Sequence, residues 1–162
     1  MLQLITSVAL VFRRPLEVAD ADITAVAGAS DQAGNSLSLD QNVVDIATGQ
    51  WVTLDANGRA TLVTTPTRLA YCVHAGGERL DVNVLTQVEA LHGMYIADTD
   101  QFRNDTGDTY AAGTDLTVEN GVLRPAASGE PVLAVAEGAP SAPTTAYPNG
   151  LLRFSTITGQ AS

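Results

Sequence analysis

The chain has 162 residues, of which 18 are acidic and 8 are basic, so its formal net charge is -10. All of the basic residues are arginines, and they are scattered along the chain rather than gathered in a patch that could neutralise a phosphate backbone. This pattern excludes a nucleic-acid-binding protein, and a hydrophobic share of 45% excludes a disordered acidic tail.

The first 48 residues differ in character from the rest. The opening run MLQLITSVALVFRRP is apolar, but Arg13 and Arg14 follow the run instead of preceding it, which is the wrong order for a secretory signal. The run is also shorter than the roughly 20 residues of a membrane-spanning helix. Residues 25–36 show no period. We therefore expect a protein made in the cytoplasm without membrane contact, in which residues 1–48 form an N-terminal arm or a subunit-bridging segment, with short helices only around 15–25 or 37–46.

Two tight hairpins are predicted from Asn-Gly dipeptides. Residues 51–55 and 59–63 alternate in polarity on either side of Asn57-Gly58, and residues 115–119 and 122–124 flank Asn120-Gly121. Asn-Gly is favoured where both central residues of a turn need a positive φ. Pro125 then limits the last strand to a short or edge position, because proline cannot donate to a ladder.

Further short apolar runs predict strands at 68–74, 80–85, 94–97, 131–136 and 151–158. The last run carries apolar residues on both faces, so both faces are expected to meet protein. Residues 138–150 predict an extended, proline-rich connector. Together these features predict a mainly β fold, a small β-barrel or β-sandwich at 49–162 with an extended N-terminal arm and little helix.

No residue pattern predicts a catalytic, cofactor or metal site. Cys72 and His74 lie two apart on a predicted strand, so their side chains point in parallel rather than converging as a nucleophile and its base do. His92 lies between apolar residues and is predicted to be a core or interface histidine.

The loop at 97–108 is rich in carboxylates of the kind that can hold calcium. It has Phe102 and Arg103 where an EF-hand needs a ligand and a glycine, and it lacks the closing glutamate. A solvated, turn-rich loop is the alternative interpretation. The loop's acidic residues are Asp98, Asp100, Asp105 and Asp108.

The order of several segments resembles the decoration or cement proteins of tailed-bacteriophage heads. The segments are GQWVTLDANGRATLVT at 49–64, GGERLDV at 76–82, LHGMYIADTDQF at 91–102, TYAAGTDLTVENGVLRPAASGEPVLAVAEG at 109–138 and GLLRFST at 150–156. The resemblance implies a non-enzymatic virion protein that binds the outer surface of the capsid. There it would bridge subunits of the major capsid protein and stabilise the shell, as a homotrimer or, as a second choice, a dimer.

Two alternatives remain open from the sequence. The first is another phage structural part, such as a tail-tube, head-completion or fibre-attachment protein. The second is a calcium-dependent carbohydrate-binding β module, which the carboxylate loop suggests and the single tryptophan, Trp51, argues against.

Overall fold

The computed structural model describes residues 1–7, 12–19, 22–26, 41–75 and 87–156. In these residues it contains thirteen strands and no α-helix. The six-stranded sheet contains, in spatial order, β1 (Leu2–Ser7), β9 (Tyr95–Thr99), β13 (Leu152–Thr156), β12 (Ala134–Ala136), β10 (Asp115–Glu119) and β11 (Val122–Pro125). The five-stranded sheet contains β2 (Phe12–Glu17), β8 (Gln87–His92), β7 (Tyr71–Ala75), β5 (Trp51–Leu54) and β6 (Ala60–Leu62). A separate ribbon contains β3 (Ile23–Val26) and β4 (Gln41–Val44).

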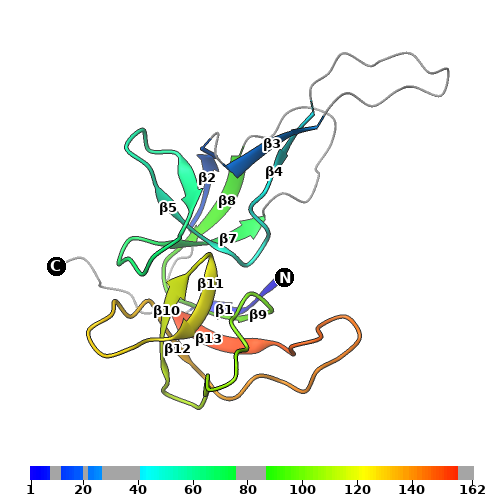
Figure 1. Cartoon of the computed structure of the whole chain (residues 1–162), viewed down its shortest axis with the longest axis vertical. Helices are drawn as coiled ribbons and strands as arrows, with labels where there is room; N and C mark the ends of the chain where they lie inside the picture. The colour runs from blue at the N-terminus through cyan, green and yellow to red at the C-terminus, as the bar shows by residue number, and fades with distance from the viewer. Residues whose placement is uncertain (8–11, 20–21, 27–40, 76–86, 157–162) are drawn as a thin grey trace.

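The mainly β prediction is confirmed, and the fold is sandwich-like rather than a closed barrel. The five-stranded sheet lies above the six-stranded sheet in Figure 1. It curls so far that Val18, just after β2, forms a single bridge with Ala60 at the opposite edge, but no ladder closes it. The short helices predicted at 15–25 or 37–46 are wrong for the described residues, because β3, β4 and the end of β2 lie there.

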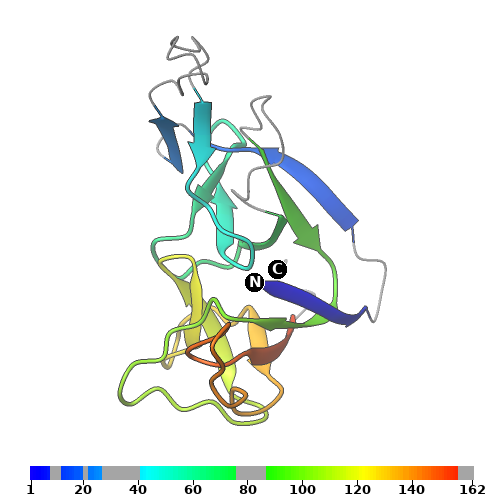
Figure 2. The ribbon, with the colours of Figure 1, turned by 90° about the vertical axis from the view of Figure 1, so that its right-hand side faces the viewer.

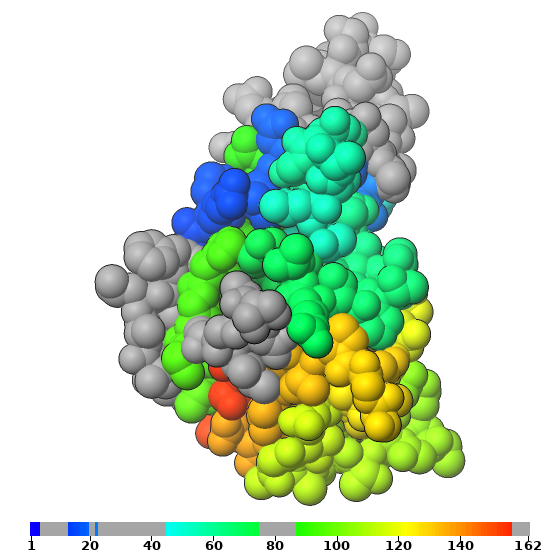
Figure 3. All heavy atoms as spheres, turned by 90° about the vertical axis from the view of Figure 1, so that its left-hand side faces the viewer, coloured from blue at the N-terminus to red at the C-terminus, as the bar shows by residue number. Residues whose placement is uncertain are grey.

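Two apolar clusters lie on the two sides of the five-stranded sheet. Neighbouring residues along a strand point to opposite faces. Trp51 and Cys72 accordingly belong to the cluster between the sheets, while Val52 and Val73 belong to the second cluster. In the space-filling view of Figure 3, residues 45–75 adjoin the yellow and orange segments of the other sheet. The five-stranded sheet is therefore buried on both faces.

The N-terminal strands belong to the two sheets. β1 pairs antiparallel with β9 in one sheet, and β2 pairs antiparallel with β8 in the other. Both strands lie along one side of the molecule in Figure 2. Leu2 and Leu16 are buried there. This corrects the predicted division at residue 48. Residues 2–7 and 12–17 do not form an arm outside the domain at 49–156, since they are strands of the same sheets. The sequence pattern did not show this, because the ladder partners of these strands lie far along the chain.

Both predicted hairpins are present, but their turns differ. Asn120 and Gly121 have φ of 50° and 76°, the pair of positive values expected for Asn-Gly. In the first hairpin only Gly58 has a positive φ, 77°, so the expectation for Asn57 is wrong. The Asp55 carboxylate accepts hydrogen bonds from the N–H groups of Asn57 and Arg59, which fixes a longer loop instead.

The hairpin of β10 and β11 joins the two sheets. The N–H of Gly121 donates to the Val63 carbonyl at 2.7 Å, and the N–H of Trp51 donates to the Gly121 carbonyl at 2.9 Å. The outer edge of β11 is covered, because Leu123 exchanges backbone hydrogen bonds with Gln101 and Arg103. The turn tip is therefore a structural contact and not a free loop.

The remaining strand predictions have mixed outcomes. The runs at 68–74, 94–97, 131–136 and 151–158 contain or overlap β7, β9, β12 and β13, while β8 was not predicted and the run at 80–85 lies outside the described residues. In β13, Leu152 and Phe154 are buried but Arg153 is exposed, so only one face is fully covered. The connector at 138–150 is not extended: the N–H of Ser141 donates to the Leu151 carbonyl, which closes it into a loop.

Candidate functional site

The cysteine and histidine that lie two apart in the sequence do not form a nucleophile–base pair. Cys72 is buried between the sheets, with its Sγ 3.8 Å from the carbonyl oxygen of Gly49. Burial raises the pKa of the Cys72 thiol to about 12, although a hydrogen bond with Tyr95 acts in the opposite direction. The thiol therefore stays protonated at neutral pH. Nδ1 of His74 is buried without a hydrogen-bond partner in the described part of the chain.

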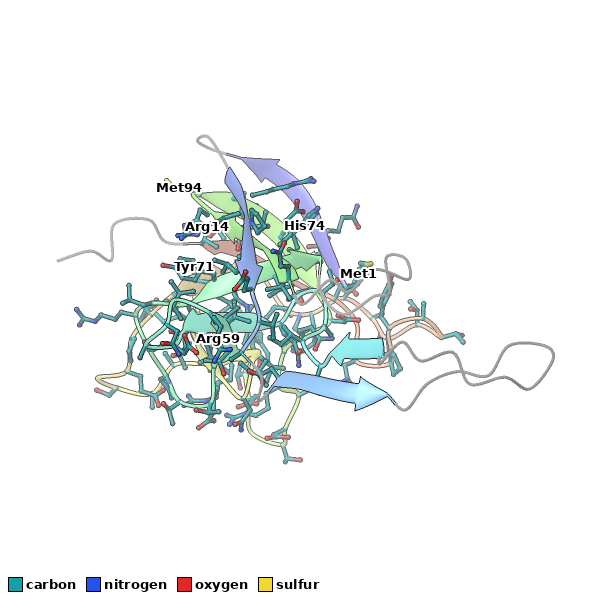
Figure 4. The ribbon with its side chains drawn as sticks, turned by 90° about the horizontal axis from the view of Figure 1, so that it is seen from above. Met1, Arg14, Arg59, Tyr71, His74 and Met94 are labelled. Carbon is teal, nitrogen blue, oxygen red and sulfur yellow. The ribbon has the colours of Figure 1, made fainter. Side chains whose placement is uncertain are left out.

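The two histidines are half-buried side chains of the five-stranded sheet. Burial lowers the pKa of His92, and nearby Arg14 lowers it further. Burial also lowers the pKa of His74, and nearby Arg13 lowers it further. The His92 ring packs on the ring of Tyr71, with centroids 4.3 Å apart. Figure 4 labels Tyr71 and His74 on β7 and Arg14 on β2. His92, predicted to be a core or interface histidine, is only partly buried, and its Nε2 has no hydrogen-bond partner among the described residues.

The carboxylates of the carboxylate-rich loop, for which calcium binding was one hypothesis, are divided among different cations. Asp98 receives two hydrogen bonds from Arg153, at 2.8 and 2.9 Å, and Asp100 pairs with the N-terminal ammonium group. Asp108 receives two hydrogen bonds from Arg103, both at 2.8 Å, and the Arg103 guanidinium lowers the pKa of Asp108. No group of three potential metal ligands forms among the described residues.

A second charged cluster lies beside this loop on the β10–β11 hairpin. Arg124 is buried and donates two hydrogen bonds to Glu130, both at 2.7 Å, and one to Glu119 at 2.8 Å. Arg103 approaches Glu119 at 3.6 Å and so connects the two clusters. The Arg124 guanidinium, together with the N–H of Ala127, lowers the pKa of Glu130 to about 2. These arginines stabilise the fold internally.

Internal pairing leaves little positive charge for contact with other molecules. Arg13, Arg59, Arg103, Arg124 and Arg153 all pair with carboxylates of the same chain. Among the described arginines, only Arg14 and Arg68 have no carboxylate partner, and both are exposed. The sequence could not reveal this, because the pairs depend on the folded arrangement.

The β3–β4 ribbon is the element most available for contact with another molecule. β3 and β4 pair only with each other among the described strands, and the ribbon projects from the body in both Figure 1 and Figure 2. Its strands, ITAV and QNVV, contain no ionisable side chain. Two strands alone are only marginally stable in water. The ribbon is therefore the candidate interaction site.

The base of the ribbon is fixed firmly to the body. The Asp22 carboxylate accepts hydrogen bonds from the Thr61 hydroxyl at 2.7 Å and the Leu62 N–H at 3.2 Å. The N–H of Asp45 donates to the Asp22 carbonyl at 2.9 Å. Ile46 is fully buried in the second apolar cluster.

Comparisons with protein-family models, with curated proteins and with solved structures found no match to this chain. Among the described residues there is no helix with the length and hydropathy that a bilayer crossing requires. The interpretation of the site therefore depends on the geometry above and on the sequence pattern.

Proposed function

We propose that the protein is a non-enzymatic decoration or cement protein of a tailed-phage virion. It binds the outer surface of the capsid and stabilises the shell by bridging subunits of the major capsid protein. The observation that carries this proposal is the projecting β3–β4 ribbon with its anchored base. The resemblance of residues 49–162 to head decoration proteins supports the choice of partner.

The ribbon has the properties of a bridging element. Among the described strands β3 and β4 pair only with each other, so each has an edge that another chain could pair with. Its strands carry no charge, so docking it requires no desolvation of an ionised group. The chain as a whole has a net charge of -10. This charge suits the outside of a shell better than the face that lines packaged DNA.

Multiple copies would make modest individual contacts strong. A homotrimer is favoured and a dimer is the second choice, because closed rotational symmetry is the usual arrangement of homo-oligomers and three-fold positions recur on capsids. An oligomer that presents several ribbons to one lattice gains affinity through multivalency. Analytical ultracentrifugation of the purified protein measures the number of subunits directly.

The main experiment removes the ribbon while keeping the body. Residues 23–44 are replaced by an Asn-Gly turn, because residues 22 and 45 are already hydrogen-bonded neighbours. The shortened protein should unfold near the wild-type temperature but fail to co-sediment with undecorated shells. Leu69→Ser, at an exposed side chain outside the ribbon, is the control and should bind normally. Wild-type coating of shells by the shortened protein would overturn the proposal.

A second variant keeps the chain connected in its natural order. Thr24→Glu combined with Asn42→Glu places a charge on each face of the ribbon, because Thr24 pairs with Val43 and Asn42 pairs with Ala25. Binding to shells should again be lost.

Gel densitometry of purified particles counts the copies of the protein on each shell. Many copies per shell agree with a decoration protein, whereas a few copies indicate a tail, head-completion or fibre-attachment part.

A further inference from the structure

The chain contains three Asn-Gly dipeptides, at Asn57, Asn120 and Asn149. In such a dipeptide the backbone nitrogen of glycine can attack the side-chain carbonyl carbon of asparagine. Glycine favours this attack because it has no side chain to hinder the approach. The reaction requires the glycine nitrogen to leave its hydrogen bond and to move toward the asparagine side chain. The folded structure therefore decides which of the three dipeptides can react.

The Asn57-Gly58 dipeptide is open to this movement. Both residues are exposed at the tip of the β5–β6 hairpin. A Cβ placed on Gly58 would meet no atom within 4 Å, so space surrounds the backbone. The Gly58 N–H donates to the Asp55 carbonyl at 3.0 Å. Water can replace this exposed hydrogen bond at little cost.

The other two dipeptides are held in place. Gly121 is buried, and both its N–H and its carbonyl are bonded to backbone of the other sheet, at Val63 and Trp51. Gly150 is buried as well, with its N–H bonded to Tyr147 at 2.9 Å. A Cβ on Gly150 would lie 2.0 Å from the Ser141 carbonyl oxygen, so the Ser141 backbone packs directly against Gly150.

We propose that Asn57 is a site of spontaneous covalent modification, converting to aspartate and isoaspartate, while Asn120 and Asn149 are protected by the fold. A bond forms between the Gly58 nitrogen and Cγ of Asn57, and the bond from Cγ to Nδ2 breaks. The side-chain nitrogen leaves as ammonia, taking with it the proton of the Gly58 nitrogen. Water then opens the resulting succinimide at either carbonyl, which gives an aspartate or an isoaspartate.

Both products change the surface of the hairpin. Each adds a negative charge next to Asp55, whose carboxylate already holds the loop through Asn57 and Arg59. The isoaspartate also adds a methylene to the main chain at the turn. Conversion at the exposed Asn57 thus accumulates with the age of each molecule. This inference does not depend on the proposed capsid role.

The test incubates the folded protein at mildly alkaline pH and measures each asparagine by peptide mapping and by enzymatic methylation of isoaspartate. Conversion at Asn57 should be about tenfold or more faster than at the other two sites, because freeing a buried N–H costs roughly that factor. In concentrated urea the three rates should converge. Asn57→Gln should remove the main signal.

Two outcomes would overturn the proposal. One is conversion of Asn120 or Asn149 in the folded protein at a rate equal to or above that of Asn57. The other is an unchanged Asn57 under conditions in which a peptide of residues 55–60 converts.

Discussion

Two hairpins of this protein carry the same Asn-Gly dipeptide and use it in different ways. The tip at Asn57-Gly58 extends into solvent, and a local carboxylate, Asp55, organises it. The tip at Asn120-Gly121 is inserted against the other sheet and hydrogen-bonded to it. The Asn-Gly sequence thus specifies a turn in both hairpins. The surrounding residues determine whether that turn is exposed to solvent or hydrogen-bonded to the other sheet.

The largest difference between the hairpins should come from adding one methyl group to each glycine. Gly121→Ala should lower the free energy of unfolding by about 3 kcal/mol. The positive φ of 76° costs an alanine about 1–2 kcal/mol, and its Cβ would lie 2.5 Å from Cδ1 of Leu62, which must move. Urea unfolding monitored by Trp51 fluorescence measures the loss. A loss of unfolding free energy no greater than that of Gly58→Ala would show that the contact between the Asn120-Gly121 turn and the other sheet is unimportant for stability.

The next effect concerns the charged stem of the β10–β11 hairpin. Arg124→Met should cost about 2 kcal/mol, because it leaves Glu119 and Glu130 without the buried guanidinium that holds them. Adding Glu130→Gln should recover part of the loss. The matching change in the first hairpin, Arg59→Met, should cost less, since its Nε lies 3.3 Å from Asp55 near the surface. Equal losses in the two hairpins would contradict this comparison.

Gly58→Ala should have a smaller effect than either change in the docked hairpin. It should cost about 1 kcal/mol, because a positive φ of 77° strains an alanine but its Cβ meets open space. Gly58→Val should cost more than Gly58→Ala, since branching at Cβ adds to the strain. Unfolding curves identical to wild type for both variants would mean that the turn at Asn57-Gly58 changes its backbone conformation without a loss of stability.

The smallest effect is a difference in acid sensitivity. The pKa of Glu130 is lowered from 4.5 to about 2, so its stabilising contribution is complete above pH 4.5 and disappears as the pH falls toward 2. Hydrogen bonds from Arg59 and Asn57 likewise lower the pKa of Asp55. Glu130→Gln should therefore flatten the loss of stability between pH 4.5 and 2 more than Asp55→Asn does. Acid titration of the three proteins by circular dichroism makes the comparison.

Local sequence patterns predicted the hairpins but not the strands that need distant partners. The predicted segment 115–119 coincides with β10, because alternation and an Asn-Gly turn are both local signals. β2 and β8 contain FRRPLE and QVEALH, whose residues have no strong strand preference. Each is a strand because it pairs with the other, and the paired residues Phe12 and His92 are 80 positions apart in the sequence.

The candidate site was predicted only in outline. A role for residues 1–48 in contact with other molecules remains a prediction, and the proposed contact uses the β3–β4 ribbon within them. The pairing of Arg153 with Asp98 depends on the register of β13 with β9, which no local pattern gives. The carboxylate loop suggested calcium because the sequence does not show that Arg103 pairs with Asp108, or that Arg153 and the N-terminal ammonium group pair with Asp98 and Asp100.

The place of β13 in the six-stranded sheet also governs the order of folding during synthesis. β13 lies between β9 and β12, so the β1–β9 pair and the β12–β10–β11 group have no direct ladder until residues 152–156 arrive. β1 must itself wait for β9, since Leu2 pairs with Thr99. Pairing over such sequence distances is slow. The backbone hydrogen bonds of Leu123 with Gln101 and Arg103 link the two groups beside β9, and the ladder becomes continuous when residues 152–156 pair with both β9 and β12.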